Sequence, residues 1–166
     1  MKKPLSTQQS PANIAAVLHL LDDTPRELDR LCSPLTPQAL HAPMRDGERT
    51  PTEVMAHLIN VEAIDTQAIL LALMRDQPLL HDIHAERDYA KWTQFQAFEF
   101  GELLAYFALR RQVLLRLLRS LSDSQWSRTI REEGKQRQES VYWRARSLAL
   151  HEQEHLTDLQ LKLNGN

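Results

Sequence analysis

Apolar residues recur at intervals of three and four along most of the chain, which is the spacing of one face of an α-helix. The pattern predicts four long helices, over about 10–31, 50–75, 94–120 and 139–162. Two short helical turns are expected at 36–40 and 123–126, and polar connectors at 41–49, 78–93 and 131–137. The chain therefore has the elements of a helical bundle.

Two of the predicted helices have well-marked starts. Ser10 is an expected N-cap, with Pro11 at the first helical position. Thr50 and Glu53 have the spacing of a capping box, in which each side chain binds the other residue's backbone N–H. Within the first helix, Pro25 removes one backbone donor and is expected to produce a kink.

The scarcity of strand signals defines the fold class. The sequence has only 4 glycines, and runs of alternating β-branched residues are almost absent. Few hairpins can be built from such a sequence, so we predict an all-α four-helix bundle with no sheet of more than token size. The length of 166 residues fits a single domain spanning 1–166.

Charge and composition narrow the class of protein. A net charge of −2 argues against nucleic-acid binding. The arginines of the second half are interleaved with acidic residues and are expected on solvated helix faces; they are Arg110, Arg111, Arg116, Arg119, Arg128, Arg131, Arg137, Arg144 and Arg146. One cysteine, Cys32, a polar start without a signal peptide and the lack of an apolar run of ~20 residues predict a cytoplasmic protein that does not interact with membranes.

Three histidines form the candidate functional site. His151 and His155 are four residues apart in the last helix and therefore lie on one face of it. His57 lies on the inward face of the second helix, and the three imidazoles meet if the two helices place them at the same level. Three neutral nitrogens leave a metal coordination position open, as in catalytic sites. Each histidine has an alternative role as a hydrogen-bonded residue on an apolar face.

The segment His151-Glu152-Gln153-Glu154-His155 also matches the H-E-x-x-H pattern of zinc proteases. That interpretation is disfavoured because no histidine follows His155 as a third ligand. Glu152 remains a candidate base for a bound water, with a helix-surface charge as the alternative. His81 and His84 form a weaker rival metal pair in a connector.

In the order of its motifs along the sequence, the chain resembles the DinB-like superfamily of metal-dependent four-helix bundles, named for DNA-damage-inducible proteins. The resemblance extends from about Pro11 to Leu163. It rests on Pro25 followed by Leu-x-x-Leu, on the turn 36–40, on the helix start 50–62 with its histidine, and on the C-terminal H-x-x-x-H. Residue by residue, His57, His151 and His155 fall on the metal ligands of the family.

The resemblance implies a right-handed up-down-down-up bundle, usually a homodimer, that binds zinc, nickel, iron or manganese. It also implies a small-molecule substrate and, in some branches, a low-molecular-weight thiol such as bacillithiol or mycothiol, used by transferases or isomerases. We therefore expect a metal-dependent thiol transferase or hydrolase with a three-histidine centre. The alternative is a non-enzymatic stress-response protein with a structural metal. Leu150 and Leu161 lie outside the core stripe of the last helix and are expected at a homodimer contact.

Overall fold

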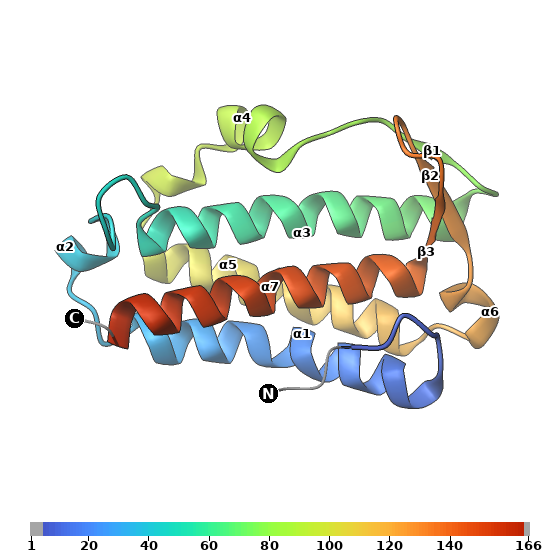
Figure 1. Ribbon diagram of the computed structural model, residues 1–166, viewed down its shortest axis with the longest axis horizontal. Coiled ribbons are helices and arrows are strands. Elements are labelled where there is room, and N and C mark those ends of the chain that lie inside the picture. Colours follow the sequence, from blue (N-terminus) through green and yellow to red (C-terminus); the bar gives the residue numbers. More distant parts are fainter. Residues whose placement is uncertain (1–4, 165–166) are drawn as a thin grey trace.

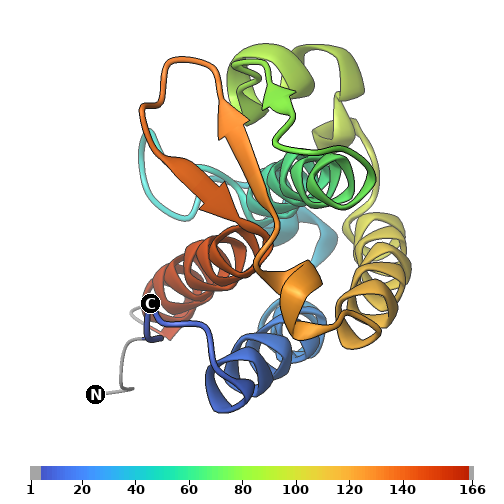
Figure 2. The same cartoon turned by 90° about the vertical axis from the view of Figure 1, so that its right-hand side faces the viewer.

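The computed structural model describes residues 5–164; the first four residues of the polar start lie outside this range. Four long helices form the bundle: α1 (Pro11–Cys32), α3 (Pro51–Met74), α5 (Phe100–Arg119) and α7 (Val141–Asn164). α1 and α7 run in one direction, whereas α3 and α5 run in the opposite one (Figure 1). Viewed end-on, α1 and α3 occupy opposite corners, and each packs against both α5 and α7 (Figure 2). The predicted up-down-down-up bundle is confirmed.

The helix starts have the caps expected from the sequence. Ser10 Oγ accepts from the backbone N–H of Asn13 at 3.2 Å. Thr50 Oγ1 accepts from Glu53 N at 3.1 Å, and Glu53 Oε2 accepts from Thr50 N at 2.7 Å. These contacts fix where α3 begins and therefore how deep His57 lies along it. The short helices α2 (Pro37–Leu40) and α6 (Asp123–Trp126) also form where predicted.

The core consists of two apolar clusters at different levels of the bundle. One includes Leu21, Leu114 and Leu148, and the other includes Leu58 and Phe107. Cys32 belongs to the second cluster and is fully buried, and burial raises the pKa of its thiol to about 12. Cys32 is therefore a packed apolar residue, because its thiolate is not populated at neutral pH.

A long crossing segment, residues 75–99, connects two helices that run in the same direction. The chain must return along the bundle, and it does so over the outer side of α3 (Figure 1). The segment contains β1 (Leu79–Leu80), a π-helical turn η1 (Ala85–Ala90), α4 (Lys91–Thr93) and a 3-10 turn η2 (Phe95–Ala97). The helix predicted from residue 94 begins only at Phe100, because Gln94 is left-handed with φ 46° and Phe98 is extended.

A small sheet covers the end of the bundle that faces the viewer in Figure 2. β1 pairs in parallel with β2 (Thr129–Glu132), which pairs antiparallel with β3 (Gln138–Ser140). The expected loop 131–137 is the tip of this β2–β3 hairpin, with Gly134 at φ 80°. Glu139 and Ser140, predicted as the start of the last helix, belong to β3 instead, so that α7 starts at Val141.

The helix α3 is long and apolar enough to cross a membrane, with a mean hydropathy of 1.3 over an 18-residue window. The sequence pattern did not predict this because polar residues interrupt every apolar run. Half of that window is buried inside the bundle. Its apolar character is that of a core helix.

Candidate metal centre

Three imidazoles from two helices converge on one point. His57 from α3 and His151 and His155 from α7 each offer a ring nitrogen, and the three nitrogens lie within 4.8 Å of one another. His57 Nε2 and His151 Nε2 are 2.9 Å apart. This is close to the spacing of about 3 Å expected for two nitrogens that are each about 2 Å from one ion. The chemistry and spacing of these donors fit a divalent transition metal.

The crossing segment places a carboxylate against the first of these ligands. Glu86 Oε1 accepts the Nδ1 proton of His57, which leaves the Nε2 lone pair directed at the cluster. A carboxylate in this position fixes the tautomer of a ligand histidine and raises its basicity. The same oxygen lies 3.1 Å from Arg49 Nη2. Arg49, Glu86 and His57 therefore form a chain of contacts that ends at the centre.

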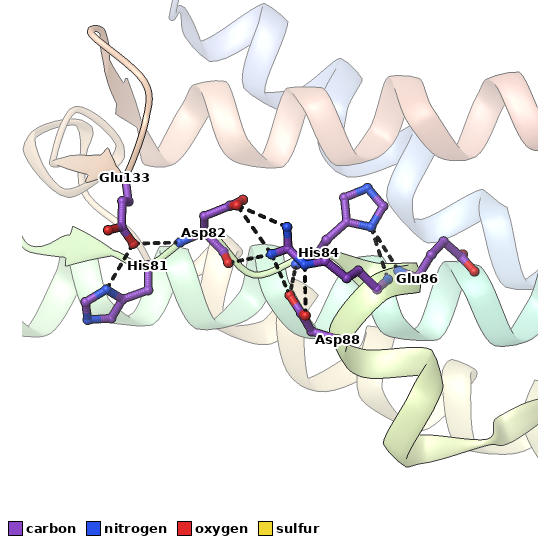
Figure 3. A network of polar contacts seen from close by, with 7 residues as sticks. His81, Asp82, His84, Glu86, Asp88 and Glu133 are labelled. Carbon is purple, nitrogen blue, oxygen red and sulfur yellow. Dashed lines mark hydrogen bonds and ion pairs between the residues drawn. The ribbon is translucent and has the colours of Figure 1, made fainter.

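A polar network holds the part of the crossing segment that carries Glu86 (Figure 3). Glu133, from the β2–β3 hairpin, accepts from His81 Nδ1 at 3.2 Å and from Asp82 N at 3.3 Å. Asp88 accepts from His84 N at 2.8 Å, and His84 Nδ1 accepts from Glu86 N at 3.2 Å. His81 and His84 thus stabilise this turn. Among the described residues, the group that could hold a metal ion is that of His57, His151 and His155.

All three imidazoles favour the neutral form, which is the form that binds metals. Burial lowers the pKa of His57 and His151, and Arg49 lowers both further. The pKa of His155 falls to about 4 because of burial and the proximity of His151 and His57. The lone pairs are therefore available at neutral pH without competition from protons.

Two cavities adjoin His57. One of about 380 Å³ is lined by Arg49, Asn60 and Glu86, among others. The other, of about 290 Å³, includes His57 and His151 and extends along α3 and α7 towards the sheet. Its walls are apolar at Val61 and Ile64. The centre is thus accessible from two sides.

The far end of the second cavity is an ionic cluster around Arg144. This arginine is 7% exposed and contacts Asp65 at 3.2 Å, Glu139 at 2.8 Å, and Glu132. Burial raises the pKa of Asp65 to about 6, against the opposing effect of Arg144. The expectation that Arg144 lies on a solvated face is therefore wrong.

Glu152, the candidate base, lies in the core. Its side chain is fully buried, and both carboxylate oxygens accept from Arg111, one of them at 2.9 Å. Arg111 also donates from Nε to Glu62 Oε2 at 2.9 Å. The expectation that Arg111 lies on a solvated face is wrong. The residue is only 1% exposed, because buried carboxylates on two other helices surround it. The catalytic role of Glu152 stays a prediction, and its contacts are those of a structural residue.

Sequence reasoning missed Glu86, Arg49 and the buried role of Arg111. The signal for Arg111 was present, since it falls within the apolar stripe of α5 between Phe107 and Leu114. Glu86 and Arg49 lie outside the long helices and gave no periodic signal. Among the aromatic residues, Trp126 and Tyr142 belong to the core, whereas Trp92 is 80% exposed.

These features define a class of protein: an up-down-down-up helical bundle with a candidate three-histidine metal centre that adjoins two cavities. The chain belongs to the DinB superfamily, whose sequence profile matches residues 20–159. Its fold is similar to that of YfiT from Bacillus subtilis, described as a probable metal-dependent hydrolase with an unusual four-helix bundle topology. The two structures have a TM-score of 0.84 at 19% sequence identity, covering 98% of this chain and 93% of YfiT. No curated protein matches the chain by sequence.

Proposed function

We propose that His57, His151 and His155 bind one divalent metal ion and that the protein is a metal-dependent hydrolase or thiol transferase. The observation that carries the proposal is the convergence of three ring nitrogens within 4.8 Å, although His57 and His151 are 94 positions apart in the sequence. A structural metal site normally has four protein ligands, and a catalytic one has three. Among the described residues, the cluster comprises these three histidines.

A divalent ion held by three neutral imidazoles would lower the pKa of a water or thiol bound to it, which supplies a nucleophile at neutral pH. The protein's own residues prepare the site. Glu86 accepts the Nδ1 proton of His57, so that the lone pair of Nε2 is available to bind the metal. The cavities on the two sides of His57 provide space for a small substrate, and the thiol of a transferase reaction would occupy part of it.

The decisive experiment is metal analysis followed by a ligand titration. Protein purified without a metal-affinity tag should contain about one equivalent of a divalent metal. After cobalt substitution, millimolar 2-mercaptoethanol should change the visible spectrum, since an open position accepts a thiolate. An unchanged spectrum, together with a fourth protein ligand in a metal-bound crystal structure, would support a structural metal in a non-enzymatic protein instead.

A further inference from the structure

One stretch of the crossing segment, residues 83–93, forms part of the wall of both cavities beside His57; we call it the cover segment. Glu86 and Ala90 line the cavity of about 380 Å³, and Ala85 lines the one of about 290 Å³. The same stretch carries the carboxylate that accepts the Nδ1 proton of His57. A movement of the cover segment therefore changes both the access to the centre and the contact made with one of its ligands.

The cover segment lies on the bundle with little buried surface. Ala85, at 7% exposure, is the buried residue within it. Polar links to α3 run from Glu86 to His57, and from Thr93 Oγ1 to Asn60 Oδ1 at 3.1 Å. A stretch held by a few polar links and one buried methyl group has a low free energy of local opening, because it has few apolar contacts to lose.

The two ends of the cover segment differ in their backbone. On the N-terminal side the chain is fixed to the hairpin, since β1 pairs with β2 and Glu133 accepts from Asp82 N at 3.3 Å (Figure 3). On the C-terminal side Gln94 is left-handed, with φ 46°. A residue with a Cβ is strained there, because this atom approaches the following carbonyl oxygen. The strain is released when the residue returns to a negative φ.

We infer that the cover segment is a lid that opens by a change of backbone conformation at Gln94, and that its closure brings Glu86 to His57. This inference rests on the proposed metal site and adds a conformational step to it. Opening joins the two cavities, since the lid is a wall of each, and gives a substrate access to the centre. Closure returns the carboxylate that orients His57, so that access and ligand orientation alternate.

Thiol labelling measures how often the lid opens. Ala85→Cys places a thiol on the inner side of the lid, which a bulky aromatic disulfide reaches only after opening. Cys32, fully buried in the core, is the internal control in the same chain, because it becomes accessible on global unfolding. In the metal-free full chain, position 85 should react at least about tenfold faster than Cys32. Equal rates would show that the segment opens only with the whole bundle, and would overturn the inference.

The hinge is tested by two glycine variants in the Ala85→Cys background. Glycine is unstrained at left-handed φ, so Gln94→Gly should make opening, and hence labelling of position 85, about fivefold slower. Gln94→Val should accelerate it, since β-branched residues rarely adopt this conformation. Gln77→Gly is the matched control: Gln77 has φ 40° but precedes the β1 anchor, so the labelling rate should not change. Equal slowing by both glycines would indicate a general gain in stability, and would overturn the hinge.

The link to the centre is tested without the introduced cysteine. Loss of the visible spectrum in excess EDTA gives the rate of cobalt release from the loaded full chain. Gln94→Gly should slow release about fivefold, since the lid is closed more of the time, whereas Gln77→Gly should not. Slower labelling with unchanged release would show that the lid does not act on the centre, and would overturn its coupling to His57. A chain that binds no cobalt would refute the proposed metal site, while the labelling rates would still decide whether the segment opens.

Discussion

Arg111 Nη1 donates a hydrogen bond to the backbone oxygen of Leu21 at 2.6 Å, although the two residues are 90 positions apart. In an uninterrupted helix that oxygen accepts from the N–H four residues later. Here that residue is Pro25, which has no N–H, yet α1 continues through it. The buried arginine thus satisfies the acceptor that the proline leaves free, and it binds Glu62 and Glu152 with its other donors.

Replacing Arg111 with methionine should lower the free energy of unfolding by about 3–5 kcal/mol, because Glu152 would remain buried without its partner and Glu62 would keep only its contact with Arg110. Urea denaturation measures this change. The combined variant Arg111→Met, Glu62→Gln, Glu152→Gln should regain much of the loss, since it removes the uncompensated charges.

Glu152→Gln alone distinguishes the two roles considered for this residue. A structural residue gives a lower urea midpoint with the metal content unchanged. A reduced turnover without any loss of stability would instead identify Glu152 as the base.

Each of His57→Ala, His151→Ala and His155→Ala should weaken metal binding by at least about tenfold, since the loss of a ligand costs no less than the loss of a residue that orients one. Elemental analysis after equilibrium dialysis measures the effect. His19→Ala is the control, because this residue is exposed on α1 and its ionic partner is Asp23 rather than a residue of the cluster. Stoichiometric metal in the triple alanine variant would refute the assignment.

Glu86→Gln should reduce metal affinity by about tenfold while changing the urea midpoint little, because Glu86 is 39% exposed and acts through His57. The amide keeps the shape of the side chain and lacks the negative charge that makes His57 more basic. Competition with a chromophoric chelator gives the affinity. Glu133→Gln is a matched control within the same network, since Glu133 binds His81 and makes no contact with a ligand histidine. Equal effects of the two variants would argue against an orienting role.

The contribution of His155 to the stability of the metal-free protein should fall as the pH is lowered from 6.5 towards 4. His155 has a pKa of about 4 in the folded protein and an ordinary value of 6.5 in the unfolded chain. Between these values the unfolded state binds more protons, so acidification favours unfolding. Asp65 opposes this, because its pKa of about 6 against 3.8 makes the folded state bind more protons over an overlapping range.

The variant His155→Gln isolates the contribution of this histidine. Between neutral pH and a pH midway between its two pKa values, the urea midpoint of the wild type should fall relative to that of the variant. An equal pH dependence in both proteins would contradict the lowered pKa.

We predict a homodimer in which α7 supplies part of the contact. Leu161 is 66% exposed, and Leu150 lies outside the core stripe of the same helix. Sedimentation equilibrium at micromolar concentration should give twice the chain mass of 19.2 kDa, and Leu161→Asp should shift the protein to the monomer. Leu109→Asp, at an equally exposed leucine of α5, tests whether any new surface charge has the same effect. A wild type that sediments as a monomer would exclude the dimer.

The bundle and the pair of His151 and His155 were predictable because both follow helical periodicity, whereas the addition of His57 to the site depended on the resemblance to the DinB-like superfamily. Capping signals at Ser10 and Thr50 fixed the helix starts, and the spacing of His151 and His155 placed both rings on one face of α7. The contacts of Glu86 were not predictable, because they depend on how a non-periodic segment crosses the bundle. The burial of Arg111 follows from its place in the apolar stripe of α5, but its pairing with Glu62 and Glu152 depends on the relative level of α3, α5 and α7, which local sequence does not encode.

The parallel arrangement of α3 and α5 has a consequence for the divergence of such proteins. It requires a crossing segment, and within residues 75–99 only Leu80 and Ala85 are fully buried. Substitutions and insertions in this segment therefore disturb the packing of the four long helices little. Because Glu86 belongs to it, the residue held against His57 can change while the histidines and the core remain. Evolution can thus retune the chemistry of the centre independently of the stability of the fold.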